Sequence, residues 1–199
     1  MPLLPLSSRI ELVTAPAAEP ITTAEVKAQM RIEHSDDDTL IERLVDTAIN
    51  FVDVTGSLGK AMITQTWGEW FPPNPGVVSL ALGPVQSVSA IKYYDTDNAI
   101  QTATLSDFYV LGPSSNTTIK PKAGKSWPTT FTRDDAIKVE YVIGYGNAAS
   151  DVPDSVRHAL MMLVAHLYEN RELSADRAMA EVPFGFDAMI DRERASWYG

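Results

Sequence analysis

Cysteine is absent from this sequence of 199 residues. Disulfide bonds and thiolate chemistry are therefore excluded, which is typical of a protein from a reducing compartment. Long hydrophobic runs are lacking too, since none approaches the ~20 apolar residues that a membrane-spanning helix needs. The beginning of the chain is interrupted by Pro2 and Pro5 and is too short for the apolar core of a signal peptide. We therefore expect a soluble protein that is neither secreted nor bound to a membrane.

Positive charge is scarce in the sequence. The chain has 16 Lys and Arg residues against 26 Asp and Glu residues, for a formal net charge of -10. Non-specific DNA binding depends on cationic side chains that displace condensed counterions, so this composition argues against it. The segment from Glu33 to Asp46 holds six acidic residues and one basic residue, Arg43, and so supplies -5 of the total.

Histidine is also rare, and the chain offers few metal ligands. A three-histidine site would use His34, His158 and His166, which are all the histidines present. His166 and Glu169 lie three residues apart and could share one helix face. Asp36-Asp37-Asp38 could meet a hard cation, but consecutive helix residues point in different directions and the EF-hand spacing is missing. We predict no metal site, no cofactor and no catalytic residues, and a cation-dependent hydrolase built on one of these groups is the alternative.

Two helices are predicted after an N-terminal arm. Residues 1–20 hold four prolines and predict an arm with at most a short strand around residues 10–13. Thr22 and Glu25 form a capping box, which predicts a short helix from Thr23 to Met30. A second helix is expected to open at Ser35, with three aspartates in its first turn, and to end before Gly56.

A third helix is predicted from Pro153 to Glu172. Proline suits the first position of a helix, where the N–H would have no intrahelical partner. Val156, Leu160, Leu163 and Leu167 then recur at helical spacing and define one apolar face. We expect this face to pack against the helices of residues 22–56.

The residues between these helices, 61–147, predict an inserted β section. Turn residues recur at short intervals and leave no room for crossover helices, so the sheet should be mainly antiparallel. The clearest strand runs from Ile137 to Ile143, and weaker patterns cover residues 78–82, 88–94 and 108–111. The fold class is therefore α+β: a helical bundle with an inserted β section and an extended C-terminal arm. We predict three parts: the arm 1–20, a single domain 21–172, and a C-terminal arm or short helix, 173–199.

The C-terminal segment is too apolar for a plain solvated tail. It contains Phe184, Phe186, Met189 and Ile190, with Trp197 further on. Two interpretations are open: the tail folds back on its own core, or it docks on a partner.

Several stretches together resemble the head-tail connector (adaptor) proteins of tailed phages and of phage-derived gene transfer agents. The resemblance covers about residues 21–190 and rests on their order and spacing. The stretches are Ile21 to Ile32 with the acidic turn before Asp38 to Ile41, Thr55-Gly56, Ile63 to Trp67, Leu82 to Val85, Tyr93 to Asp95, Gly144-Tyr145-Gly146, Val152-Pro153, Tyr168 to Arg171, and Val182 to Gly185.

This resemblance implies a structural protein and not an enzyme. It implies a ring, of twelve copies, beneath the portal protein and above a tail-side stopper or tail-terminator protein, in a virion assembled in the bacterial cytoplasm. DNA would pass through the channel without specific binding, which suits a negatively charged protein. The portal-interface candidates are Tyr168, Asn170, Arg171, Pro183, Phe184, Phe186, Met189, Ile190, Trp197 and Tyr198.

A closed ring needs a heterologous interface, in which two different surfaces of each subunit meet. We expect these surfaces to be the acidic helix and a set of positive groups on the neighbouring copy. The ring-interface candidates are Lys27, Arg31, Asp36, Asp37, Asp38, Glu42, Asp46 and Arg157. Another virion component, such as a tail-completion protein, is a second alternative to the connector.

Overall fold

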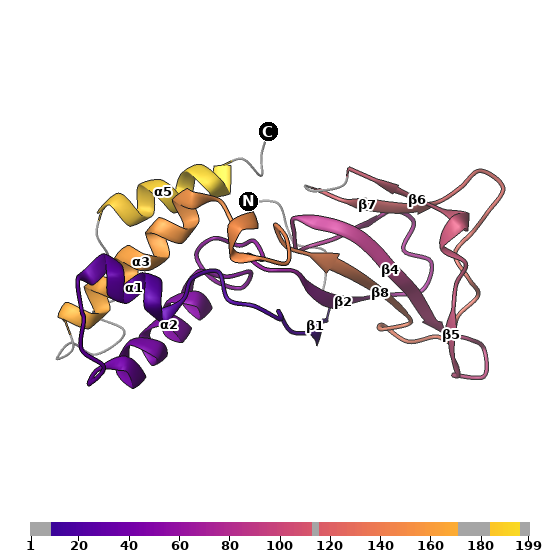
Figure 1. Ribbon diagram of the computed structural model, residues 1–199. Helices are drawn as coiled ribbons and strands as arrows, with labels where there is room; N and C mark the ends of the chain where they lie inside the picture. Colours follow the sequence, from indigo (N-terminus) through magenta and orange to yellow (C-terminus); the bar gives the residue numbers. More distant parts are fainter. Residues whose placement is uncertain (1–8, 113–115, 171–183, 196–199) are drawn as a thin grey trace. The chain divides into compact units, whose positions relative to one another are not determined.

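The chain divides into two compact units in the computed structural model, which describes residues 9–112, 116–170 and 184–195 (Figure 1). The β unit comprises residues 1–16 and 64–144, and the helical unit comprises residues 17–63 and 145–199. The α+β class predicted from the sequence is confirmed. Within the described residues, no helix combines the length and the apolar character that crossing a bilayer requires.

The β unit contains two antiparallel sheets. The five-stranded sheet has the order β1 (Ile10–Thr14), β2 (Gln65–Phe71), β8 (Ile137–Ile143), β4 (Val85–Tyr94) and β5 (Ile100–Thr102). The three-stranded sheet has the order β3 (Val78–Ser79), β7 (Thr118–Pro121) and β6 (Phe108–Leu111). The predicted strands at 108–111 and 137–143 are confirmed at those residues, whereas β5 and β7 were not predicted.

Strand β8 is central to the larger sheet and is buried on both faces. One face carries Ile137, Val139 and Tyr141, all fully buried. Lys138 and Glu140 lie on the other face and are only 9% and 8% exposed. Buried charges are tolerated when they are paired. Both side chains must therefore have charged partners within the sheet.

These partners form a series of ion pairs, Glu11–Lys138–Glu140–Lys92, that links three strands, β1, β8 and β4. The Lys138 ammonium contacts the carboxylates of Glu11 and Glu140, the latter at 3.0 Å, and Lys92 Nζ lies 2.8 Å from Glu140 Oε1. Burial alone would lower the pKa of Lys138, but the two carboxylates outweigh it and raise that pKa. The hydrogen bond from Lys138 lowers the pKa of Glu11. These ion pairs hold β1, from the N-terminal arm, against the middle of the sheet.

The helical unit is built from α1 (Thr23–Met30), α2 (Asp38–Val52), α3 (Asp154–Glu169) and α5 (Phe184–Ala195). The capping box and bounds predicted for α1 are confirmed. The predicted start of α2 at Ser35 is three residues early, because Asp36 and Asp37 precede the helix in a turn and Asp37 is its N-cap. Pro153 likewise is the N-cap of α3 and not its first residue.

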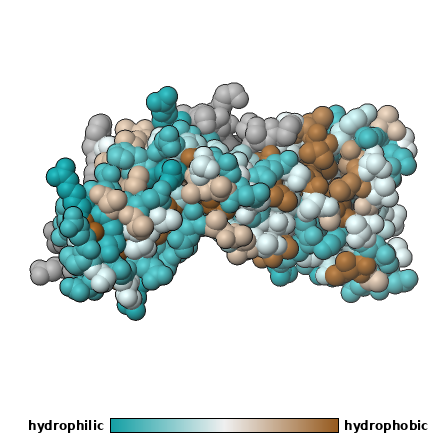
Figure 2. All heavy atoms as spheres, in the orientation of Figure 1, coloured by the Kyte–Doolittle hydropathy of each residue, from teal (hydrophilic) through white to brown (hydrophobic). Residues whose placement is uncertain are grey.

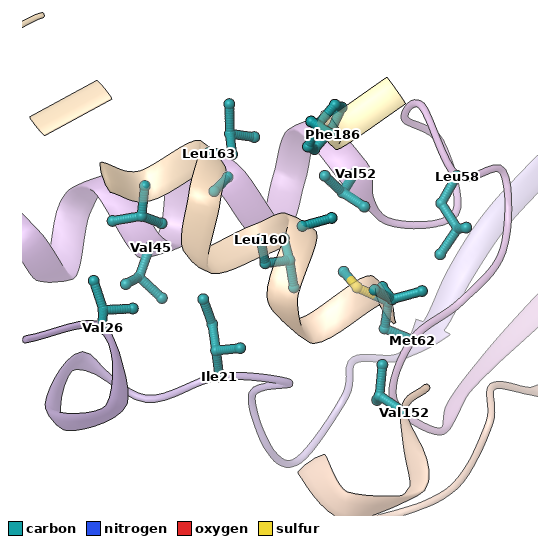
Figure 3. Close-up of a cluster of buried hydrophobic side chains, with 14 of the residues drawn as sticks. Ile21, Val26, Val45, Val52, Leu58, Met62, Val152, Leu160, Leu163 and Phe186 are labelled. Carbon is teal, nitrogen blue, oxygen red and sulfur yellow. The ribbon is translucent and has the colours of Figure 1, made fainter. Parts of the chain in front are cut away.

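One hydrophobic core joins α1, α2, α3 and α5. Leu160 and Leu163 of α3 meet Val45 and Val52 of α2 in this core, as Figure 3 shows. Phe186 of α5 lies in the same cluster and is only 1% exposed, and its ring centroid lies 6.3 Å from that of Phe51. Residues 184–195 therefore form a helix that folds back on the core of the chain, which is one of the two interpretations left open by the sequence.

Replacing Phe186 tests how firmly α5 belongs to the core. We expect Phe186→Ala to lower the free energy of unfolding of the helical unit by about 3–5 kcal/mol, because the substitution leaves a cavity among buried side chains. Asp187→Ala is the matched control, since Asp187 is exposed on the same helix. Urea unfolding followed by circular dichroism at 222 nm measures both. Equal stability of the two variants would show that α5 contributes little to the core.

Candidate interaction surfaces

Arg157 ties α3 to α1 at the beginning of both helices. Its Nε donates to the Pro20 carbonyl at 3.0 Å, and its guanidinium also pairs with the Glu25 carboxylate. Glu25 accepts the Thr22 backbone N–H at 2.8 Å as the second half of the capping box. That backbone hydrogen bond lowers the pKa of Glu25, and Arg157 lowers it further. Arg157, a ring-interface candidate, is thus engaged within its own chain.

The acidic entrance to α2 is also paired within the chain. The Lys27 ammonium bonds to the Asp38 carboxylate, and the Tyr168 hydroxyl at the far end of α3 donates to Asp37. Three ring-interface candidates and a portal-interface candidate therefore hold α1, α2 and α3 together. Arg31, Asp36, Glu42 and Asp46 are the ring-interface candidates that remain exposed. Arg31 ends α1 in the left-handed region, at φ 58°.

The portal-interface candidates are dispersed over different environments. Phe186 and Ile190 are buried in the core, and Met189 packs against it. Asn170 Nδ2 donates to the His166 carbonyl at 2.8 Å and so caps the end of α3. Phe184 begins α5. Arg171, Pro183, Trp197 and Tyr198 lie outside the described residues.

Polar contacts fix the far end of α5 as well. The Ser155 hydroxyl donates to Glu193 at 2.9 Å, and the Lys60 ammonium donates to the Glu193 carbonyl. The Arg194 guanidinium donates to the Ser57 carbonyl. Burial lowers the pKa of Lys60, and it raises the pKa of Tyr145 to about 12. The helix is therefore held by hydrogen bonds in addition to its apolar face.

Charge and exposed apolar surface separate between the two units, which the sequence alone did not reveal. The β unit has seven Lys and Arg against eight Asp and Glu, a net charge of -1, and the helical unit has nine against eighteen, a net charge of -9. In the described residues, all nine exposed large hydrophobic side chains belong to the β unit. In Figure 2, apolar residues gather on the surface over β6 and β7. The signal was hidden because the β unit is assembled from two separate segments.

The metal ligands considered from the sequence do not assemble. Within the described ranges, no three His, Asp or Glu side chains are grouped as a metal site would require. His166 lies one turn before Asn170, and Asp37 is engaged by Tyr168.

Comparison with known proteins identifies the family of the chain. A family model of head completion proteins matches residues 19–180. The chain belongs to this family. Head completion proteins are structural virion proteins and not enzymes, and the predicted resemblance to head-tail connectors is confirmed. No curated protein matches the sequence significantly.

Solved structures extend the likeness to almost the whole chain. A chain in the neck of an empty GTA particle, computed with C6 symmetry, aligns with a TM-score of 0.74 at 21% identity, covering 94% of this chain and 95% of that one. A chain in the neck of a native GTA particle, computed with C12 symmetry, gives 0.72 at 22% identity, with 94% of each chain covered. A chain in the virion of a native gene transfer agent gives 0.72 at 20% identity, covering 93% and 94%. At sequence identities of 20–22%, the similarity to these chains establishes a shared fold.

The contacts of Glu25 with the Thr22 backbone N–H and with Arg157 predict a pH-dependent contribution to stability. The pKa of Glu25 is lower in the folded chain than its ordinary value of 4.5, so ionised Glu25 stabilises the fold above about pH 4.5. This contribution is lost as pH falls through the lowered folded pKa. Glu25→Gln should therefore be less stable than wild type at pH 7, and the difference should shrink below pH 4.5.

Glu42→Gln is the matched control because Glu42 is an exposed glutamate on α2. Urea midpoints of the three proteins at pH 3 to 8 measure the effect. A constant difference between wild type and Glu25→Gln over the whole range would contradict the prediction.

Proposed function

We propose that this head completion protein is a structural subunit of the neck of a phage-like particle, at the junction between head and tail. The observation that carries the proposal is the shared fold: the match to chains from GTA necks spans nearly the full length of both partners. Family membership over residues 19–180 supports the same role independently of the structure. The proposal covers both an infectious phage and a gene transfer agent.

The subunits form a ring, and we propose twelve copies. The neck of the native GTA particle was computed with C12 symmetry, and that of the empty particle with C6 symmetry, a subgroup of it. A cyclic ring is compatible with a chain that has two different contact surfaces, one for each neighbour. Assembly of the particle places this ring in the bacterial cytoplasm before release.

The ring encloses a channel for DNA, and the acidity of the chain suits such a channel. The helical unit alone carries -9. Negative walls repel phosphate and prevent the adhesion that clustered lysines would cause. DNA thus passes through without specific binding.

The portal lies on one side of the ring and a stopper or tail-terminator protein on the other. Because the apolar face of α5 is buried in the chain's own core, the portal contact uses other groups. We propose the exposed side of α5, around Asp187 and Asp191, together with Arg171, Pro183, Trp197 and Tyr198.

Mixing the chain with the portal protein of the same particle tests this function. We expect native mass spectrometry to show a complex with twelve copies of the chain, and negative-stain images to show a ring on the portal. Replacing both Trp197 and Tyr198 by alanine should weaken portal capture, whereas Asp187→Ala should have a smaller effect on it. A chain that stays monomeric and unbound at high portal concentration would overturn the neck assignment.

A further inference from the structure

Two strands of the β unit carry most of the exposed apolar surface. Of the nine exposed large hydrophobic residues in the described part of the chain, six lie on β1 and β6. They are Ile10, Leu12 and Val13 on β1, and Tyr109, Val110 and Leu111 on β6. Single exposed apolar residues are ordinary on a protein surface, but three together on one strand indicate a contact site.

Both strands are also sheet edges. Among the described strands, β1 pairs only with β2, and β6 pairs only with β7. The outer side of an edge strand presents N–H and C=O groups to which another strand can pair. The other two edges, β3 and β5, have only two and three residues, and short edge strands are a common protection against pairing. β1 and β6, with five and four residues, are the long edges.

Contacts within the β unit hold each of these two edge strands in place. The ion pair with Lys138 fixes Glu11 of β1, and Arg9 lies over the Trp70 ring at 5.8 Å. On β6, buried Phe108 packs against Trp127 with ring centroids 4.8 Å apart. Binding to an ordered strand requires little loss of conformational freedom. Both edges are therefore prepared for a partner.

We propose that β1 of one copy pairs with β6 of the next copy, and that this strand pairing forms the ring contact. The inference rests on the proposed ring, which requires two different surfaces on every chain. β1 and β6 meet this requirement, because they lie on opposite borders of the β unit in Figure 1. The occupant is a second copy because the chain itself supplies both halves of the contact, on a unit whose net charge is only -1. Copies therefore meet there without the repulsion that the helical unit would impose.

Cysteine cross-linking tests the pairing directly, since the chain has no cysteine of its own. The full-length double variant Leu12→Cys, Leu111→Cys is treated with a short bis-maleimide under conditions in which wild type forms rings by native mass spectrometry. We expect a ladder of covalent products up to the complete ring, because every copy links to both neighbours. Each single variant should give no product beyond background.

The outcomes separate three situations. Dimers from Leu12→Cys or Leu111→Cys alone would show like strands facing each other and would overturn the proposal. Rings of the double variant that yield no ladder would place the contact elsewhere and would also overturn it, while the neck function would stand. Absence of rings for wild type, alone and with portal, would contradict the proposed function itself.

Lysine substitutions at the edges supply a second readout. Leu12→Lys and Leu111→Lys should each raise the concentration needed for ring formation by about tenfold or more, because each contact would bury an unpaired ammonium group. Phe131→Lys is the matched control, since Phe131 is 44% exposed, against 47% for Leu12 and 43% for Leu111, but lies outside the strands. The double variant Leu12→Lys, Leu111→Glu should recover much of the ring, because the two charges would meet. Equal effects of Phe131→Lys and Leu111→Lys, or no recovery in the double variant, would contradict the pairing.

Discussion

Burial of the apolar face of α3 is the constraint on which the helical unit depends. α3 packs against α1 and α2, which precede the β section in sequence, and against α5, which follows it. Each fully buried leucine on this face contributes roughly 1.5–3 kcal/mol. The helices at the two ends of the chain are thereby held together through one element, and the long β section is accommodated as an insertion between them. Arg157 and Tyr168 add polar ties near the two ends of the same helix.

The two units differ in net charge and in exposed apolar surface. The helical unit concentrates negative charge and, in its described residues, leaves no large hydrophobic side chain exposed. The β unit is nearly neutral, and its edges are apolar. Self-association is favoured by exposed apolar area and opposed by like charge. Repulsion of DNA, in contrast, requires negative charge on the protein. Under the proposed neck function, a subunit would both bind its neighbours and let DNA pass, and the division of these properties between two units meets both needs.

Local signals in the sequence were sufficient for α1, α2 and α3 and for the strongest strands. The capping box at Thr22 and the period of α3 depend on residues close in sequence, so they could be read without a structure. The pairing of β1 with β2 and the burial of Lys138 could not be predicted in this way, because they depend on strands more than fifty residues apart. The candidate site was less predictable for the same reason. The sequence predicted that Lys27 and Arg157 contact a neighbouring copy, but their carboxylate partners lie on other elements of the same chain.

The relative size of the interactions favours an apolar ring contact over a charged one. A solvent-exposed ion pair contributes only about 0–1 kcal/mol, and Lys27 or Arg157 would first have to give up an existing partner. Exchanging one such pair for another gains almost nothing. Burial of apolar surface contributes roughly 25 cal/mol per Å², and added backbone hydrogen bonds fix the register of the two strands. Exposed Arg31, Asp36, Glu42 and Asp46 can steer copies toward one another or keep them apart, but closing a ring requires the larger and more directional contact that strand edges provide.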